Sequence, residues 1–289
     1  MISFDPPVEE IRAAVNLALA EDVGPLGDLT SSLVPPGDIT AEIVARDAGR
    51  LAGWACATEV FRQVDSSVTV EWHAADGDRV APDQSLAVVA GPRASILTAE
   101  RTALNFLSHL SGIATEVSRY VAAAASGGRT RIRDTRKTTP GLRVLEKAAV
   151  RAGGGDNHRM GLSEWVMFKD NHLAGMSIAD GVTAARRSWP DRIVYVECDR
   201  IEQVGEALAA GADALLLDNM SPDEVRVCVA QAAGHDCLVE VSGGITLETV
   251  AEYAATGVDF ISVGRITNSA PALDIGLDVN DALEPSQEG

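Results

Sequence analysis

The second half of the sequence repeats one pattern, in which a short apolar run is followed by a helical stretch. Six such runs follow one another at intervals of about 20–36 residues. They are "TRIRDTR" (130–136), "WVMFKDNH" (165–172), "RIVYVECD" (192–199), "DALLLDNM" (213–220), "CLVEVSGG" (237–244) and "DFISVGR" (259–265). The stretches between them, such as "IEQVGEALAAGA" and "LETVAEYAATG", have helical spacing. This alternation predicts a parallel α/β fold, either a barrel or an open sheet, and the short connections favour the barrel.

Each of the six runs ends in polar residues or glycine. In chain order these ends carry Arg136 and Lys137; Lys169, Asp170 and Asn171; Glu197 and Asp199; Asp218 and Asn219; Ser242, Gly243 and Gly244; and Gly264. The active site of an α/β barrel is built at the C-terminal ends of its strands. We therefore expect these groups to face one common mouth.

The first part of the chain has a different pattern. Residues 7–21 have the apolar stripe of an amphipathic helix, and residues 95–125, which include Arg101, return to helical spacing. Between them, residues 40–91 contain short alternating apolar runs that are typical of a small antiparallel sheet. This part is predicted to form a separate domain.

The charge of the chain is strongly uneven. Its formal net charge is −18, yet residues 129–169 hold ten bases and four acids, including all three lysines. The helical spacing around Lys147 and Arg151 suggests solvated helix charges. Elsewhere the bases alternate with Thr, Gly, Pro, Asn and His, which suggests loops that bind an anion. The overall acidity argues against general binding of nucleic acid or anionic membranes.

The sequence also predicts a compartment. No apolar run reaches the roughly 20 residues of a membrane-spanning helix, and the first residues do not resemble a signal peptide. The four cysteines are scattered and contain no C-x-x-C pair. Buried free thiols in a reducing cytoplasm are therefore expected, rather than disulfides or a zinc site.

Two kinds of anion are suggested by the predicted mouth. The late motifs "SGGI" and "SVG" favour a phosphate ester, although Gly-Gly is also a simple turn. Glu197 and Asp218 could hold Mg²⁺ or stabilise a cationic sugar, while Asp218 alone could instead cap the next helix. Arg136, His158, Arg159 and Lys169 suit a small polycarboxylate, although His158 taken alone could be a structural loop histidine.

Long ordered motifs resemble one known family. They are "LAEDVGPLGDLTS", "TAERTALNFLSHLSGIAT", "RDTRKTTPGLR", "EKAAVRAGGGDNHRMGL", "FKDNH", "LLLDNM", "SGGI" and "APALDIGLDV". Together they resemble the quinolinate phosphoribosyltransferase family, the decarboxylating nicotinate-nucleotide pyrophosphorylases of NAD biosynthesis. The resemblance covers nearly the whole chain.

The resemblance implies a fold and an assembly. The expected fold is an N-terminal α/β sandwich, residues 1–107 joined by a C-terminal strand at 273–289, and an incomplete parallel α/β barrel at 108–272. This architecture is type II phosphoribosyltransferase-like. The family forms homodimers or assemblies of dimers, in which Arg101 is expected to cross into the neighbouring subunit's site.

The resemblance also implies roles for individual residues. Lys137, Glu197 and Asp218 match the catalytic groups around ribose and pyrophosphate, with Mg²⁺ held by the two acids indirectly through substrate or water. Arg136, His158, Arg159 and Lys169 match the residues that bind the two quinolinate carboxylates. The groups expected around the 5-phosphate and elsewhere on the substrates are Thr135, Ser242, Gly243, Gly244, Val263, Gly264 and Arg265.

The implied reaction joins quinolinate to phosphoribosyl pyrophosphate and yields nicotinate mononucleotide, pyrophosphate and CO₂, with no organic cofactor. Four positions depart from the usual family pattern: Tyr195, Val241, Arg265 and Asn268. Three alternatives remain. They are a paralogue of the molybdenum-operon type or a nicotinate-specific transferase, a barrel aldolase using Lys169 as a Schiff-base amine, and a phosphate-binding barrel without activity.

Overall fold

The computed structural model describes residues 6–279 and divides them into two compact units. The first unit contains the described residues up to Glu116, then Thr139–Gly154 and the residues from Ala270 onward. The second contains Val117–Thr138 and Gly155–Ser269. Residues 139–154 thus belong by their contacts to the first unit, although they had been expected within the barrel range. Among the described residues, no helix has the length and apolarity needed to cross a membrane.

The first unit is built on a four-stranded antiparallel sheet of order β12-β1-β5-β3. These strands are β1 (Asp38–Ala45), β3 (Thr69–Trp72), β5 (Ser85–Pro92) and β12 (Ile275–Val279). The C-terminal β12 pairs with β1, with Leu277 opposite Ile43. The expected C-terminal strand at 273–289 is thus present as far as Val279, and residues 280–289 lie outside the described residues. A small second sheet pairs β2 (Gly49–Arg50) with β4 (Arg79–Val80).

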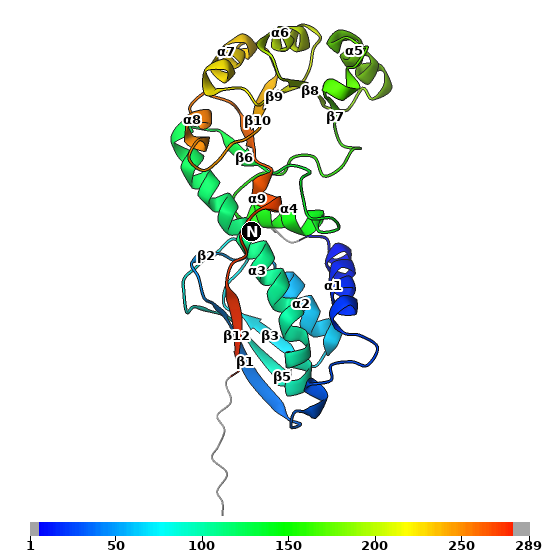
Figure 1. Cartoon of the computed structure of the whole chain (residues 1–289), viewed down its shortest axis with the longest axis vertical. Helices are drawn as coiled ribbons and strands as arrows, with labels where there is room; N and C mark the ends of the chain where they lie inside the picture. The colour runs from blue at the N-terminus through cyan, green and yellow to red at the C-terminus, as the bar shows by residue number, and fades with distance from the viewer. Residues whose placement is uncertain (1–5, 280–289) are drawn as a thin grey trace, which may run out of the picture. The chain divides into compact units, whose positions relative to one another are not determined.

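The first unit also contains helices, the longest of which, α3 (Arg93–Ala124), continues into the second unit (Figure 1). They are α1 (Val8–Asp22), the short η1 (Ser31–Leu33), α2 (Trp54–Val64), α3 and α4 (Arg143–Ala152). The two long helical predictions, at 7–21 and 95–125, are confirmed by α1 and α3. Ile96, Leu107 and Ile113 are fully buried along α3, as its periodic apolar pattern requires. One prediction is wrong: Lys147 in α4 is fully buried rather than solvated.

The second unit is a six-stranded parallel sheet that forms the incomplete barrel. The strand order is β6-β11-β10-β9-β8-β7. In chain order the strands are β6 (Arg131–Arg133), β7 (Val166–Phe168), β8 (Val194–Cys198), β9 (Ala214–Asp218), β10 (Leu238–Ser242) and β11 (Phe260–Ser262). All six predicted strands are present. Among the described strands no pairing joins β7 to β6, so the sheet does not close.

Helices cover one side of this sheet (Figure 1). They are α5 (Ile178–Ser188), α6 (Ile201–Ala209), α7 (Pro222–Ala232) and α8 (Val250–Ala254). Short turns follow α3 at η2 (Ala125–Gly127), β7 at η3 (Asp170–His172) and β11 at α9 (Arg265–Asn268). The strand register places Ser242 opposite Asp218. Because all strands are parallel, their polar C-terminal ends meet at one edge, as the sequence predicts.

Candidate active site

A cavity of about 550 Å³ opens at the C-terminal edge of the barrel sheet and lies within the second unit. This volume is in the range of sites for small ligands. The lining includes every residue that the family resemblance assigned to the substrates or to catalysis, except Arg101. These residues are Thr135, Arg136, Lys137, His158, Arg159, Lys169, Glu197, Asp218, Ser242, Gly243, Gly244, Val263, Gly264 and Arg265. Four polar residues that were also expected at this mouth, Asp170, Asn171, Asp199 and Asn219, are exposed and do not line the cavity.

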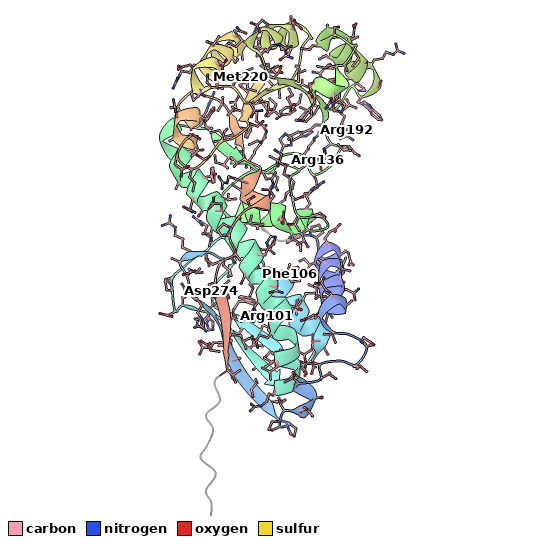
Figure 2. The ribbon with its side chains drawn as sticks, viewed as in Figure 1. Arg101, Phe106, Arg136, Arg192, Met220 and Asp274 are labelled. Carbon is pink, nitrogen blue, oxygen red and sulfur yellow. The ribbon has the colours of Figure 1, made fainter. Side chains whose placement is uncertain are left out.

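Arg101 is the exception because it lies on α3 in the first unit (Figure 2). Its side chain is exposed. Arg101 does not line the cavity of its own chain, and its expected reach into the site of a neighbouring subunit stays a prediction.

One part of the cavity carries the basic residues. Arg159 is only 6% exposed, and its Nη1 donates a hydrogen bond to the backbone oxygen of Trp165 at 3.2 Å. Burial, followed by the nearby charge of Arg136, lowers the pKa of the Arg159 guanidinium. The two guanidinium groups repel each other in a partly desolvated environment. An anionic ligand bound between them would offset this repulsion.

The two acids lie at the ends of neighbouring strands. Glu197, at the end of β8, forms an ion pair with the ammonium of Lys169. Asp218, at the end of β9, accepts hydrogen bonds from Ser242 Oγ and Asn219 Nδ2, both at 2.7 Å. Ser221, rather than Asp218, caps the following helix α7. Asp218 is therefore held in the cavity by its neighbours, and the capping interpretation is not what the structure shows.

Glycines set the backbone of the two loops that follow β10 and β11. Gly243 has φ +97, and a Cβ there would lie 2.7 Å from the backbone nitrogen of Asn219. A side chain at Gly243 would be strained on both grounds. At Gly264 a Cβ would lie 2.8 Å from Lys137 Cδ. Gly243 therefore requires glycine, whereas a side chain at Gly264 would displace the flexible Lys137 side chain.

Replacing Gly264 with alanine is expected to lower kcat about tenfold, because the new methyl group displaces the Lys137 side chain by a fraction of an ångström to an ångström. Thermal stability is expected to change little, since the displaced atoms belong to a flexible side chain. Steady-state kinetics and thermal unfolding measure both quantities. The matched control is Gly205→Ala on α6, where a Cβ meets nothing within 4 Å. A normal kcat for Gly264→Ala would show that the position of Lys137 does not matter.

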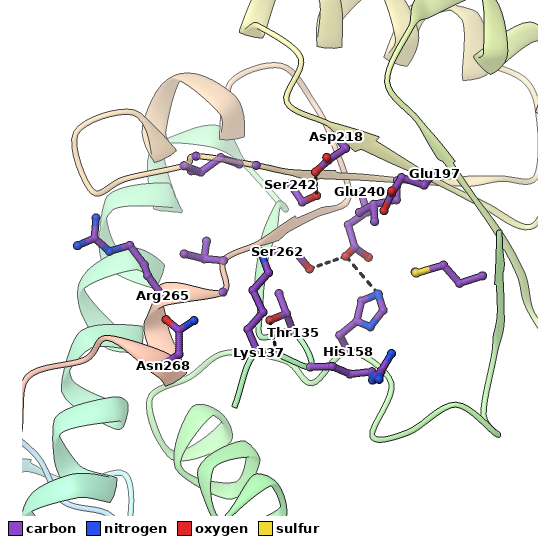
Figure 3. Close-up of a pocket in the computed structure, with 18 of the residues that line it drawn as sticks. Thr135, Lys137, His158, Glu197, Asp218, Glu240, Ser242, Ser262, Arg265 and Asn268 are labelled. Atoms are coloured by element: carbon purple, nitrogen blue, oxygen red, sulfur yellow. Dashed lines mark hydrogen bonds and ion pairs between the residues drawn. The ribbon is translucent and has the colours of Figure 1, made fainter. Parts of the chain in front are cut away.

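Several lining residues were not nominated from the sequence. They are Met167, Leu216, Glu240, Ile245, Thr246 and Ser262. Asn268, which the sequence marks only as a departure from the family pattern, also lines the cavity. Glu240 is fully buried at the floor of the cavity (Figure 3). The sequence did carry one signal, because an acid interrupts the apolar run of a central strand in "CLVEVSGG".

The two acids are compatible with one kind of metal site. Among the described residues, no group of three or more His, Cys, Asp or Glu side chains is arranged to hold a metal ion. Mg²⁺, however, is commonly bound through one or two carboxylates together with substrate phosphates. Glu197 and Asp218 fit that mode, in which the substrate supplies the remaining oxygens.

The fold and cavity together define a class of protein. An incomplete parallel α/β barrel presents glycine loops, paired acids and a cluster of cations to one cavity, which is the arrangement of a transferase acting on phosphorylated, anionic substrates. Family models identify the particular kind. The quinolinate phosphoribosyl transferase C-terminal domain matches residues 113–278, and its N-terminal domain matches residues 28–111. The chain belongs to the quinolinate phosphoribosyl transferase family.

Individual relatives agree. The chain is 43% identical over 282 residues to the probable nicotinate-nucleotide pyrophosphorylase (carboxylating) of Bacillus subtilis (strain 168), covering 96% of each chain. It is 41% identical over 282 residues to that of Mycobacterium leprae (strain TN), covering 95% of this chain and 99% of the relative. The solved nicotinate-nucleotide pyrophosphorylase of Francisella tularensis superimposes with a TM-score of 0.91 at 39% identity, covering 95% of this chain and 98% of that one.

Proposed function

We propose that this protein transfers the phosphoribosyl group of phosphoribosyl pyrophosphate to quinolinate and releases pyrophosphate and CO₂, giving nicotinate mononucleotide for NAD biosynthesis. The observation that carries the proposal is the single cavity that joins a pair of close cations, Arg136 and Arg159, to paired acids and glycine loops. Such a cavity accommodates a dicarboxylate beside a phosphorylated sugar.

The acids and Lys137 act on the ribose half. In the transfer step the C1–O bond of the ribose breaks, its electron pair leaves with pyrophosphate, and the pyridine nitrogen forms the new bond to C1. Positive charge that develops on the ribose is stabilised by the carboxylates of Glu197 and Asp218, and Lys137 offsets the charge of the leaving pyrophosphate. We further propose that Mg²⁺ binds with phosphoribosyl pyrophosphate at Glu197 and Asp218, where it would neutralise phosphate charge.

The basic residues act on the quinolinate half. We propose that Arg136, His158, Arg159 and Lys169 bind the two carboxylates, since guanidinium groups pair bidentately with carboxylate oxygens. Once the ring nitrogen is a pyridinium, the bond from C2 to its carboxylate breaks and the electron pair stays at C2. CO₂ leaves and C2 takes up a proton. The protein contributes positioning and charge, and no protein nucleophile takes part.

The alternatives are less well supported. A Schiff-base aldolase needs Lys169 as a neutral amine, whereas its ammonium forms an ion pair with Glu197. A molybdenum-operon type paralogue has no support from the relatives described above, which are named as carboxylating pyrophosphorylases. A barrel without activity would have no use for the ordered acids and Lys137.

The proposal is tested by incubating the protein with quinolinate, phosphoribosyl pyrophosphate and Mg²⁺, and measuring mononucleotide by chromatography. Product that requires both substrates is expected. The absence of product from the wild-type protein would contradict the proposed function.

Arg265 is expected to strengthen binding of the sugar phosphate. Figure 3 shows Arg265 and Asn268 on one side of Lys137, with His158 and Glu240 on the other. Arg265→Ala is therefore expected to raise the KM for phosphoribosyl pyrophosphate about three- to tenfold and leave the KM for quinolinate unchanged. Initial rates with each substrate varied in turn measure both constants. An unchanged KM for phosphoribosyl pyrophosphate would mean that Arg265 points away from the phosphate.

We also propose that the protein acts as a homodimer or an assembly of dimers in which exposed Arg101 reaches the partner's site, and that it works in a reducing cytoplasm. Mixing Arg101→Ala and Lys137→Ala subunits tests the shared site. About a quarter of the wild-type activity is expected to return. When equal amounts of the two subunits mix at random, half of the dimers are mixed, and one of the two sites in each mixed dimer is then intact. Activity that does not recover on mixing would place Arg101 in its own subunit's site. For the compartment, none of the four cysteines, all of which lie in the described part of the chain, forms a disulfide, and Cys56, Cys198 and Cys228 are buried.

A further inference from the structure

Glu240 is a buried acid to which the proposed chemistry gives no role. It lies in the middle of β10, between Val239 and Val241, and its side chain is fully buried while lining the floor of the cavity. Taking a carboxylate out of water costs several kcal/mol unless hydrogen bonds and charges compensate. A buried acid at this place therefore needs partners, and its partners indicate what it does.

Four side chains from different parts of the barrel converge on this carboxylate. Its Oε2 accepts a hydrogen bond from Arg133 Nη1 at 2.9 Å and one from Tyr195 OH at 3.3 Å. Its Oε1 accepts a hydrogen bond from Ser262 Oγ and lies 3.5 Å from His158 Nε2 (Figure 3). Burial raises the pKa of the Glu240 carboxyl, whereas these donors favour its ionised form. The Arg133 guanidinium at 2.9 Å pairs with Glu240 as a charged carboxylate.

The two oxygens serve different purposes. Oε2 faces Arg133, whose guanidinium carbon lies 3.2 Å from the centroid of the Phe260 ring. Arg133 is not part of the cavity lining, so this half of the network compensates the buried charge. Oε1 faces His158, which does line the cavity. Ser262 Oγ already donates to Oε1, so the contact with His158 comes in addition to the bonds that compensate the buried charge.

The position of His158 is fixed from several sides. Its backbone nitrogen donates to Asp134 Oδ1 at 2.8 Å. Its ring packs edge-on against Trp165 with centroids 4.8 Å apart, and lies 5.8 Å from the Tyr195 ring. Glu240 Oε1 therefore faces Nε2 of a ring that is held on several sides, and this contact fixes the orientation of the imidazole at the cavity that it lines.

We propose that Glu240 is a positioning residue for the dicarboxylate substrate: it orients the His158 imidazole, and His158 contacts a carboxylate of quinolinate. The inference rests on the proposed function. It links Glu240 to the quinolinate half, because His158 is the one of its four partners to which the proposed function gives a contact with substrate. Its loss is therefore selective for quinolinate over phosphoribosyl pyrophosphate.

The test uses Glu240→Gln, which keeps the shape of the side chain and removes its charge. The KM for quinolinate is expected to rise about 10- to 100-fold, the size of one lost hydrogen bond to a charged group. The KM for phosphoribosyl pyrophosphate is expected to stay within about twofold and kcat within about threefold. The matched control is Tyr195→Phe, which removes one donor at Oε2 and leaves Oε1 facing His158. Its KM for quinolinate is expected to change less than about threefold.

A double-mutant cycle with His158→Gln separates positioning from a structural role. In the His158→Gln background, Glu240→Gln is expected to raise the KM for quinolinate no further, because the group that it positions is gone. Effects that multiply, or equal increases in KM for both substrates, would overturn the proposal. Should Glu240→Gln fail to fold by thermal unfolding, Ser262→Ala removes the donor at Oε1 alone. It is then expected to raise the KM for quinolinate selectively, about threefold or more.

Failure of the proposed function and failure of the positioning role give different results. If the wild-type protein gives no mononucleotide, the proposed function fails and with it the basis of this inference. If the wild type is active and the Glu240 and Ser262 variants show no selective loss for quinolinate, only the positioning role is overturned.

Discussion

Replacing Lys137 with methionine is expected to lower kcat about 10²- to 10³-fold, the usual cost of removing one group that stabilises transition-state charge. Lys137 is held by its backbone on both sides. Its N–H donates to Thr135 Oγ1 at 2.9 Å, and its oxygen accepts from Thr267 Oγ1 at 2.8 Å. Methionine keeps the length of the side chain and loses only the ammonium. The backbone is thus expected to stay in place, and the loss to report the charge alone.

Steady-state kinetics and thermal unfolding check this prediction together. The control is Arg131→Met. Arg131 belongs to the same basic segment, residues 129–169, but it is exposed and does not line the cavity. Its surface ion pair with Asp156 contributes little to stability. Arg131→Met is expected to keep wild-type kcat. A similar kcat for Lys137→Met would remove Lys137 from the catalytic groups.

Replacing Arg159 with leucine is expected to raise the KM for quinolinate about 100-fold or more, because a largely desolvated guanidinium pairs with a carboxylate far more strongly than an exposed one does. Arg159→Lys is expected to lose about tenfold, since lysine keeps the charge and loses bidentate pairing. Burial and Arg136 lower the pKa of Arg159, so the charged form is held unfavourably without an anion. Quinolinate should relieve this repulsion.

Thermal unfolding with and without quinolinate measures that relief. The wild type is expected to gain stability on adding quinolinate, following the usual linkage of ligand binding to folding. Arg159→Leu is expected to unfold at the same temperature as the unliganded wild type, or a higher one, and to gain little from quinolinate. An undiminished gain for Arg159→Leu would show that the dicarboxylate binds elsewhere.

The barrel and most of its cavity could be predicted from the sequence for a simple geometric reason. Parallel strands place their C-terminal ends at one edge, so each apolar run that ends in a polar group contributes to the same mouth. That is why Lys169, Glu197 and Asp218, which are distant in sequence, could be nominated together. The glycine motif "SGGI" was visible because the left-handed φ and the close backbone approach at Gly243 require glycine.

The number of bases in a segment predicted the cavity residues less well, because it does not show which way each side chain points. Of the ten bases between residues 129 and 169, only Arg136, Lys137, Arg159 and Lys169 line the cavity. Arg133 turns inward to Glu240, and Lys147 is buried in α4 of the first unit. The Glu240 network could not be predicted because its partners come from separate strands and a loop, and sequence spacing does not show which side chains meet inside a barrel.

The most direct test of the central claim compares quinolinate, labelled in its C2 carboxylate, with nicotinate as partner for phosphoribosyl pyrophosphate. The account predicts mononucleotide from quinolinate with one equivalent of labelled CO₂ for each product, and no more than trace product from nicotinate. Efficient product from nicotinate, without release of CO₂, would contradict the assignment of Arg136, His158, Arg159 and Lys169 to a dicarboxylate.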